Sequence, residues 1–211
     1  MTGVQTCALP ISWNDALARI GAELLHARLD TLADVLPHAA EAYETIAPVN
    51  NRISAQYKTA LDLSGIPIGA VRETLEARLL EAMAERRREE VARGVTLVGP
   101  QRDDITLSIG DLPAKGYASH GESWSLALAL KLGGFALVRA DGIEPVLVLD
   151  DVFSELDETR RERLAGAVAD AEQVLITAAV GADVPDFPSA RRFRVQGGTV
   201  GPVEEPEVTD D

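Results

Sequence analysis

The chain contains very few of the side chains that bind transition metals or form disulfides. Its 211 residues include one thiol, Cys7, so an intramolecular disulfide and a cysteine-based zinc site are excluded. The three histidines, His26, His38 and His120, are too scattered in sequence to predict a metal site. Long apolar runs are also lacking. No run reaches the roughly 18 residues that span a bilayer, so no membrane association is expected.

Positive charge is scarce as well. The chain has 20 Lys and Arg residues against 34 Asp and Glu residues, which gives a formal net charge of -14. General binding to nucleic acid needs a basic face, because Lys and Arg neutralise phosphates. A DNA contact would therefore need a local basic patch or an assembled partner. Arg86, Arg87 and Arg88 form one basic cluster, but a solvated helix face that pairs with nearby Glu is the favoured interpretation.

The first residues, MTGVQTCALPIS, show no helical or strand period and lack the basic segment of a secretory signal. Read with GTG as the start codon, a common sequencing-adapter oligonucleotide encodes Met1–Ile11. We therefore expect residues 1–12 to be a translated adapter, extended and without a packing partner, in place of a natural upstream segment. An ordinary disordered N-terminus is the alternative.

Residues 13–94 are predicted to be mainly helical. Apolar residues at helical spacing predict a helix that starts after Ser12, and Pro37 is expected to separate it from a second helix. Alternating apolar residues predict a strand within residues 51–59. A further long helix is expected to end at Gly94, because glycine commonly terminates helices.

After residue 94 the pattern becomes mixed α/β. Short strands are predicted at residues 95–98 and 105–109, followed by a hairpin turn at 110–111 and a buried helix at 123–140. A parallel strand–helix–strand unit is predicted at residues 145–179, and a closing strand pair at 191–201. Residues 202–211 hold five acids and two prolines, which favours a disordered acidic tail. The predicted fold class is therefore α/β.

The strongest sequence feature is VLVLDDVFSELD, in which an apolar strand ends in Asp150 and Asp151. Carboxylates at the carboxyl end of a parallel strand lie where open α/β sheets bind ligands. The first acid is placed to hold Mg²⁺ through its water shell, and the second to orient an attacking water. A strand that merely ends in a polar turn is the alternative interpretation.

Two further motifs accompany the paired acids. Ser119, Gly121 and Glu122 precede a long helix, whose first amides and dipole favour phosphate. A simple Ser N-cap beside a flexible glycine is the alternative. The segment Ser154–Asp157 directly follows the acids, and by itself it is typical of an N-cap turn before a helix.

The order of these motifs resembles the C-terminal lobe of ABC-type ATPases. GPQRDD, ASHGESWSLALALKL and VLVLDDVFSELDETRRERL most resemble the RecF family of DNA replication and repair proteins, especially its actinobacterial members. The resemblance extends from Trp13 to about Pro185. It implies a helical arm segment over residues 13–94 and an ABC-ATPase C-terminal lobe over residues 95–201.

The resemblance also assigns roles to the motif residues. The signature motif, Ser119, Gly121 and Glu122, would contact the ATP of the partner protomer. At the end of the Walker B strand, Asp150 would hold Mg²⁺ and Asp151 would be the catalytic residue that activates water. Ser154 and Asp157 would belong to the D-loop that follows.

In that family the intact protein would be a cytoplasmic ATPase of DNA repair, recombination and the SOS response. It would bind ATP and Mg²⁺ and form an ATP-dependent head-to-tail homodimer. It would bind single- and double-stranded DNA at single-strand gaps, and would help mediators of the RecO and RecR type to load recombinase. All of these properties are implied by the resemblance alone.

The chain also departs from the family pattern. It contains no G-x-x-x-x-G-K-[ST], so the loop and Lys that cradle the nucleotide phosphates are absent, and the chain alone is expected to be inactive. Gln101 replaces a common family histidine, and Ala178 stands where ABC transporters usually place a switch histidine. Trp124 stands where many members have Arg and is expected to serve packing or docking.

Two other interpretations of the chain are possible. A chromosome-maintenance ATPase of the SMC or Rad50 type would have long upstream heptads, whereas the helical segment here is short and contains Pro37 and Pro48. A non-enzymatic interaction module could also use an inherited ABC-like lobe. An in-frame phosphate-binding loop in the upstream gene sequence would favour the ATPase.

Overall fold

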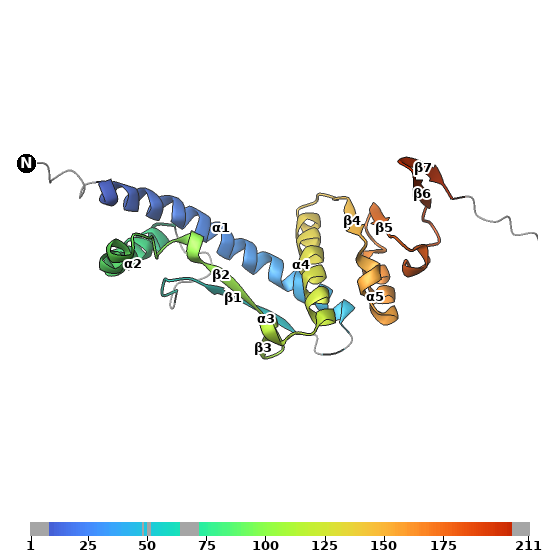
Figure 1. Cartoon of the computed structure of the whole chain (residues 1–211), viewed down its shortest axis with the longest axis horizontal. Coiled ribbons are helices and arrows are strands. Elements are labelled where there is room, and N and C mark those ends of the chain that lie inside the picture. Colours follow the sequence, from blue (N-terminus) through green and yellow to red (C-terminus); the bar gives the residue numbers. More distant parts are fainter. Residues whose placement is uncertain (1–8, 48, 50–51, 64–71, 204–211) are drawn as a thin grey trace, which may run out of the picture.

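The computed structural model describes residues 9–47, 49, 52–63 and 72–203 (Figure 1). Its helices and strands are, in chain order, α1 (Leu9–Ile46), β1 (Ile53–Lys58), α2 (Arg72–Arg93), β2 (Asp104–Ile109), β3 (Leu112–Pro113), α3 (Ala114–Tyr117), α4 (His120–Ala140), β4 (Leu147–Asp150), α5 (Glu158–Val168), β5 (Val174–Thr177), β6 (Phe193–Gln196) and β7 (Thr199–Pro202). The predicted mixed α/β class is confirmed. No helix within the described ranges is long and apolar enough to cross a membrane.

Helix α1 extends from the α2 end of the molecule to α4 (Figure 1). The prediction that Pro37 divides it is wrong, since α1 continues through this residue. Proline removes one backbone hydrogen bond and crowds the preceding turn. Packing on both sides of Pro37 offsets that cost: Ala18, Ala22 and Leu25 are buried before it, and Ala39, Tyr43 and Ile46 are buried after it.

The start of α1 also differs from the prediction. The helix begins at Leu9 and includes Ser12, so Ser12 is not its N-cap and the backbone of residues 9–12 is helical rather than extended. Residues 1–8 lie outside the described residues. The adapter interpretation of residues 1–12 therefore stays a prediction.

The first core joins α1 to α2. It contains Ala18, Ala22, Leu25, Leu61, Leu75, Leu79, Ala82, Met83 and Val98. The α2 residues of this core recur at helical spacing, so one face of the helix packs on α1. As predicted, α2 ends before Gly94, whose φ of 66° favours glycine. Arg86 pairs with Glu89 at 3.0 Å, which supports the solvated-face interpretation of the basic cluster.

Strand β1 pairs antiparallel with β2, and β2 pairs with β3 through the predicted Gly110-Asp111 turn. The strand predicted at residues 95–98 is wrong, because the described structure has no strand there. The Glu90 carboxylate accepts hydrogen bonds from the amides of Leu97 (2.7 Å) and Val98 (3.4 Å). This carboxylate therefore occupies backbone donors that a strand would have used.

The β1–β2 pairing links a residue range before position 94 to one after it, and α1 packs against both α2 and α4. These contacts cross the division expected between residues 94 and 95. The division itself stays a prediction.

The second core forms between α4, α5 and the β4–β5 sheet. It contains Ile46, Leu128, Leu132, Leu147, Leu149, Phe153, Leu156, Leu164 and Val168. Strands β4 and β5 are parallel and joined by α5, which confirms the predicted crossover unit. Strands β6 and β7 form the predicted closing pair. Residues 204–211 of the expected acidic tail lie outside the described residues, while Pro202 belongs to β7.

Candidate functional site

Strand β4 ends at Asp150, and β5 ends beside it at Thr177 in parallel register. The Thr177 hydroxyl donates a hydrogen bond to the Asp150 carboxylate. The Asp151 amide donates to the hydroxyl and to the carbonyl oxygen of Thr177, each at 3.1 Å. Thr177 therefore orients the first acid and fixes the backbone of the second. Thr177 was not predicted as a site residue, although a polar residue that ends a second apolar strand was an available signal.

Asp151 has φ 51° and ψ 26°, the left-handed region, and it is the one described non-glycine residue with a positive φ. This conformation is uncommon for residues with a Cβ and tends to occur at functional sites. It turns the chain sharply from β4 into a 3₁₀ helix, Val152–Glu155. The Ser154 hydroxyl donates to the Asp151 carbonyl at 2.8 Å and closes this turn. Ser154 therefore has a structural role in the described geometry.

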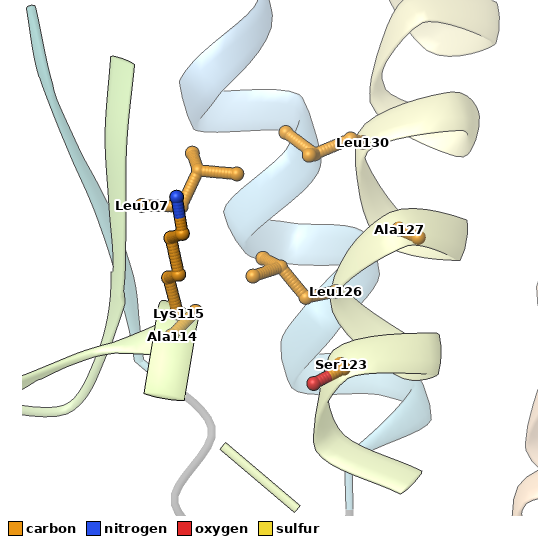
Figure 2. A pocket seen from close by; sticks show the side chains of 7 residues that line it. All are labelled: Leu107, Ala114, Lys115, Ser123, Leu126, Ala127 and Leu130. Carbon is orange, nitrogen blue, oxygen red and sulfur yellow. The ribbon is translucent and has the colours of Figure 1, made fainter. Parts of the chain in front are cut away.

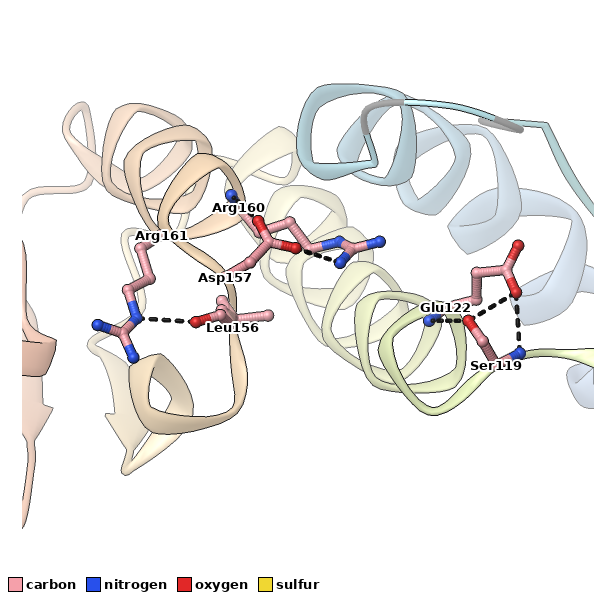
Figure 3. A network of polar contacts seen from close by, with 6 residues as sticks. All are labelled: Ser119, Glu122, Leu156, Asp157, Arg160 and Arg161. Atoms are coloured by element: carbon pink, nitrogen blue, oxygen red, sulfur yellow. Dashed lines mark hydrogen bonds and ion pairs between the residues drawn. The ribbon is translucent and has the colours of Figure 1, made fainter.

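The loop Ser154–Asp157 is held in place by the buried side chain of Phe153 and by hydrogen bonds with α5. Phe153 is fully buried and meets the Phe187 ring edge-on, with 6.4 Å between ring centroids. Arg161 donates from Nε to the carbonyl oxygens of Phe153 and Leu156, each at 2.8 Å. Figure 3 shows the contact with Leu156. The Asp157 carboxylate caps α5 by accepting from the Arg160 amide at 2.9 Å. These contacts fix the loop directly after the paired acids.

Helix α4 begins with a complete capping box. The Ser119 hydroxyl accepts from the Glu122 amide at 3.2 Å, and the Glu122 carboxylate accepts from the Ser119 amide at 2.8 Å (Figure 3). The Ser119 hydroxyl also donates to that carboxylate at 2.8 Å. This is the N-cap that the alternative interpretation expects. It defines the local conformation in which Ser119 and Gly121 would have to meet a phosphate.

The structure brings the segment Ser119–Glu122 next to the loop Ser154–Asp157. His120 Nε2 lies 3.4 Å from Glu155 Oε2, across the gap between the start of α4 and the loop after β4. The paired acids lie instead at the end of the β4–β5 sheet. Trp124 is 36% exposed on α4, and Gln101 donates to the Val98 carbonyl at 3.2 Å. Neither of these two observations assigns a chemical role.

A groove of about 220 Å³ lies between β2, α3 and α4 (Figure 2). Its lining residues are Leu107, Ala114, Lys115, Ser123, Leu126, Ala127 and Leu130. The lining is mostly apolar and has no carboxylate. The groove is therefore separate from the paired-acid site.

The residues at the end of β4 fit a magnesium ion of the usual nucleotide-bound kind. Within the described ranges, no three His, Cys, Asp or Glu side chains gather as a metal cluster. Mg²⁺ in phosphate-transfer enzymes is commonly bound through one or two carboxylates, with phosphates and waters as its other ligands. The Asp150 carboxylate beside the Thr177 hydroxyl supplies such oxygen ligands. The phosphates would have to be held by residues that this chain does not contain.

No protein-family model matches the chain. The chain is 60% identical over 199 residues to the DNA replication and repair protein RecF of Cutibacterium acnes, and 56% identical over 188 residues to that of Streptomyces avermitilis. Both alignments cover 89% of this chain. The chain belongs to the RecF family. It covers 50% and 49% of these two relatives, so it spans about half their length.

Solved structures agree on the fold. A structure of the recombination mediator protein RecF-ATPrS in the RecFOR pathway matches with a TM-score of 0.75 at 23% identity, covering 95% of this chain and 52% of the other. The RecF-ATP structure matches with a TM-score of 0.76 at 22% identity, with the same coverage. The chain thus shares the α/β fold of about half of each of these RecF chains.

Proposed function

We propose that this chain is the part of a RecF-type DNA replication and repair ATPase that carries the signature motif, the Walker B acids and the D-loop. The main support is the geometry at the end of β4, where Thr177 orients Asp150 and fixes Asp151 in a left-handed turn. A parallel strand that buries one face and ends in two acids is suited to metal and water chemistry at a phosphate. The relatives named RecF, at up to 60% identity, support the same function.

The motif residues divide the work between two protomers. Asp150 would hold Mg²⁺, which neutralises charge on the transferred phosphoryl group when it is bound. Asp151 would accept a proton from, or orient, the attacking water. Ser119, Gly121 and Glu122 would face the ATP of the partner protomer, and Ser154 and Asp157 would form the D-loop beside that interface. The ATPase would therefore act as an ATP-dependent homodimer.

The proposed partners follow from the same function. We expect single- and double-stranded DNA at gaps, and mediator proteins of the RecO and RecR type, to bind the intact protein. The net charge of -14 opposes a broad DNA-binding face on this chain. The DNA surface is therefore expected to be local or to come from the other half of the protein.

Three substitutions in one chimaera test this function. The chimaera joins this chain to the half of the Cutibacterium acnes relative that it does not cover, which is expected to supply the nucleotide-binding loop. Asp151→Asn should keep ATP binding and dimerisation but lower turnover by roughly 10²–10⁴-fold, as for a lost general base. Asp150→Asn should weaken nucleotide binding too, because it removes a magnesium ligand.

The third substitution addresses the partner site. Ser119→Arg should leave ATP binding to each protomer intact but prevent dimerisation, because a bulky cation would block the facing phosphate. ATP affinity, ATP-dependent dimerisation and turnover are measured on all three variants. An equal loss of affinity in all three would identify these residues as structural and reject the composite site.

A further inference from the structure

The signature segment and the D-loop segment touch at two places within one protomer. The outer contact is the pair His120–Glu155 at 3.4 Å, whose side chains are 80% and 50% exposed. A contact so open to water contributes little to stability by itself. The second contact, made by Arg160, is more enclosed.

Arg160 reaches from the first turn of α5 toward the first turn of α4 (Figure 3). Its Nη1 donates to the Asp157 carboxylate at 2.5 Å, and its side chain is 19% exposed. The guanidinium lies against Gly121, where an added Cβ would stand 3.2 Å from Nη1. Arg160 thus contacts the D-loop acid and the signature glycine at once. The missing side chain at Gly121 makes room for it.

The interior of this junction is enclosed, and Tyr43 packs there among Ala47, Leu126 and Ala129. Tyr43 of α1 is fully buried, and neither its hydroxyl nor Arg160 Nε has a hydrogen-bond partner among the described residues. Burial raises the pKa of Tyr43, the negative charge of Glu122 raises it further, and the positive charge of Arg160 opposes them. Glu122 of α4 and Arg160 of α5 therefore both shift the pKa of one buried phenol on α1. Three helices meet at the point where the two motifs touch.

We propose that Arg160 is a positioning residue that fixes the D-loop against the signature helix, so that both motifs meet a nucleotide as one unit. This inference rests on the proposed function for its consequence in the ATPase, and on the geometry alone for the link itself. In this role Arg160 touches no reacting group. It acts through Asp157 and through the backbone at Gly121.

The rest of α5 is held without Arg160. Leu164 and Val168 are buried in the second core. Arg163, on the same helix, donates to the carbonyl oxygens of Thr45 (3.3 Å) and Ala47 (3.4 Å) at the end of α1. Arg163 ties α5 to α1, and among the described residues its side chain makes no hydrogen bond or ion pair with Gly121 or Asp157. It is therefore the matched control for Arg160.

Hydrogen–deuterium exchange on the 211-residue chain tests the link directly. Arg160→Met should raise amide exchange in peptides covering 119–125 and 152–157, because both segments lose a shared anchor. Arg163→Met should raise exchange near residues 44–47 and leave the two motif segments unchanged. Arg160→Lys keeps the charge and should restore part of the protection. Unchanged exchange of the motif segments in Arg160→Met, or equal effects of Arg160→Met and Arg163→Met, would overturn the proposal.

A double-mutant cycle provides a readout that general destabilisation would not imitate. In the wild-type background, Gly121→Ala should lower the melting temperature, since the new methyl group displaces the guanidinium. In the Arg160→Met background the same change should lower it less or raise it, because the flexible Met side chain can give way and alanine favours a helix over glycine. Equal shifts in both backgrounds would show that Gly121 and Arg160 are not coupled.

The chimaera separates this inference from the proposed function. There, Arg160→Met should preserve ATP affinity and reduce ATP-dependent dimerisation by about tenfold, a typical coupling between sites. Arg163→Met should preserve both. If the unaltered chimaera neither binds ATP nor dimerises, the proposed function fails, while the exchange and cycle experiments still decide the link. If Arg160→Met dimerises normally, the positioning role fails.

Discussion

At the residue scale, the molecule contains a buried phenol with an unusual environment. Tyr43 is fully buried, and its hydroxyl has no hydrogen-bond partner in the part of the chain that the structure describes. Burial, followed by the charge of Glu122, raises its pKa above the ordinary 10.0. The folded state thus favours the neutral phenol. The resulting contribution of Tyr43 to folding stability is fully present below the pKa that the phenol has in the unfolded chain. It is lost as the pH rises through the higher pKa of the folded state.

We predict that Tyr43→Phe is neutral or stabilising by about 1 kcal/mol at pH 7, since it removes an unsatisfied buried hydroxyl. Above about pH 10 the wild type should lose more stability than the variant, because only the wild type must keep this phenol neutral. Urea unfolding between pH 7 and 11 measures both effects. A variant that is clearly less stable at pH 7 would mean that the hydroxyl has a native partner.

Tyr57→Phe is the matched control. Its hydroxyl donates to the Asp103 carboxylate at 3.1 Å, and Arg28 Nη1 lies 3.4 Å away as a donor. This substitution removes satisfied hydrogen bonds, so it should destabilise the protein by about 1 kcal/mol at pH 7. If the two Tyr→Phe substitutions change the stability in opposite directions, the cause is the missing hydrogen-bond partner at Tyr43 and not a general effect of losing a hydroxyl.

Single residues also show how far the site could be predicted from sequence. Asp150 and Asp151 were evident because an apolar strand runs directly into two carboxylates. Thr177 was not, because its importance depends on the register between β4 and β5. Arg160 was not, since its partners lie on two elements. Chemistry encoded by neighbours in sequence is predictable, and chemistry assembled by packing is not.

At the element scale, the crossing of α1 and α4 depends on a glycine. A Cβ at Gly133 would lie 2.7 Å from the backbone nitrogen of Ala39, closer than real Cβ contacts occur. A Cβ at the neighbouring Gly134 would meet no atom within 4 Å among the described residues. Two adjacent glycines of one helix therefore have opposite packing environments.

We predict that Gly133→Ala destabilises the protein by about 1–3 kcal/mol, the usual range for overpacking, because the two helix backbones must separate. Gly134→Ala should stabilise it by up to about 1 kcal/mol, since alanine favours the helix and meets no neighbour. Chemical denaturation of both variants measures the difference. Equal stability changes would mean that α1 and α4 do not approach closely at Gly133.

Elements were predicted correctly where local pattern determined them, as for α2, the β2–β3 turn and the β4–α5–β5 unit. They were mispredicted where distant packing or a side chain intervened. Helix α1 continues through Pro37 because both flanks are buried, and residues 95–98 stay out of a strand because Glu90 binds their amides. Propensity is a weak signal when tertiary contacts compete with it.

At the scale of the whole molecule, the chain carries the residues that we propose as Walker B and signature groups, but its sequence contains no G-x-x-x-x-G-K-[ST]. Under the proposed function, these residues would act on a nucleotide that other residues hold. We predict that the purified 211-residue chain hydrolyses no ATP beyond a control with both Asp150→Ala and Asp151→Ala. A magnesium-dependent phosphate-release assay measures this. Activity above the control would show that the chain binds nucleotide by itself, and would reject the division of roles proposed here.

Helix α1 connects two distant parts of the molecule, so a tilt at one end would displace the other. About 25 residues separate Ala18, in the core with α2, from Tyr43, at the motif junction. At 1.5 Å per residue that distance is about 37 Å, so a tilt of about ten degrees at the junction would carry the far end by about 6 Å. The helix is continuous through Pro37, which supplies no backbone N–H and so removes one internal hydrogen bond. A small tilt of α1 at Tyr43 would therefore be amplified into a larger displacement of the α2 end.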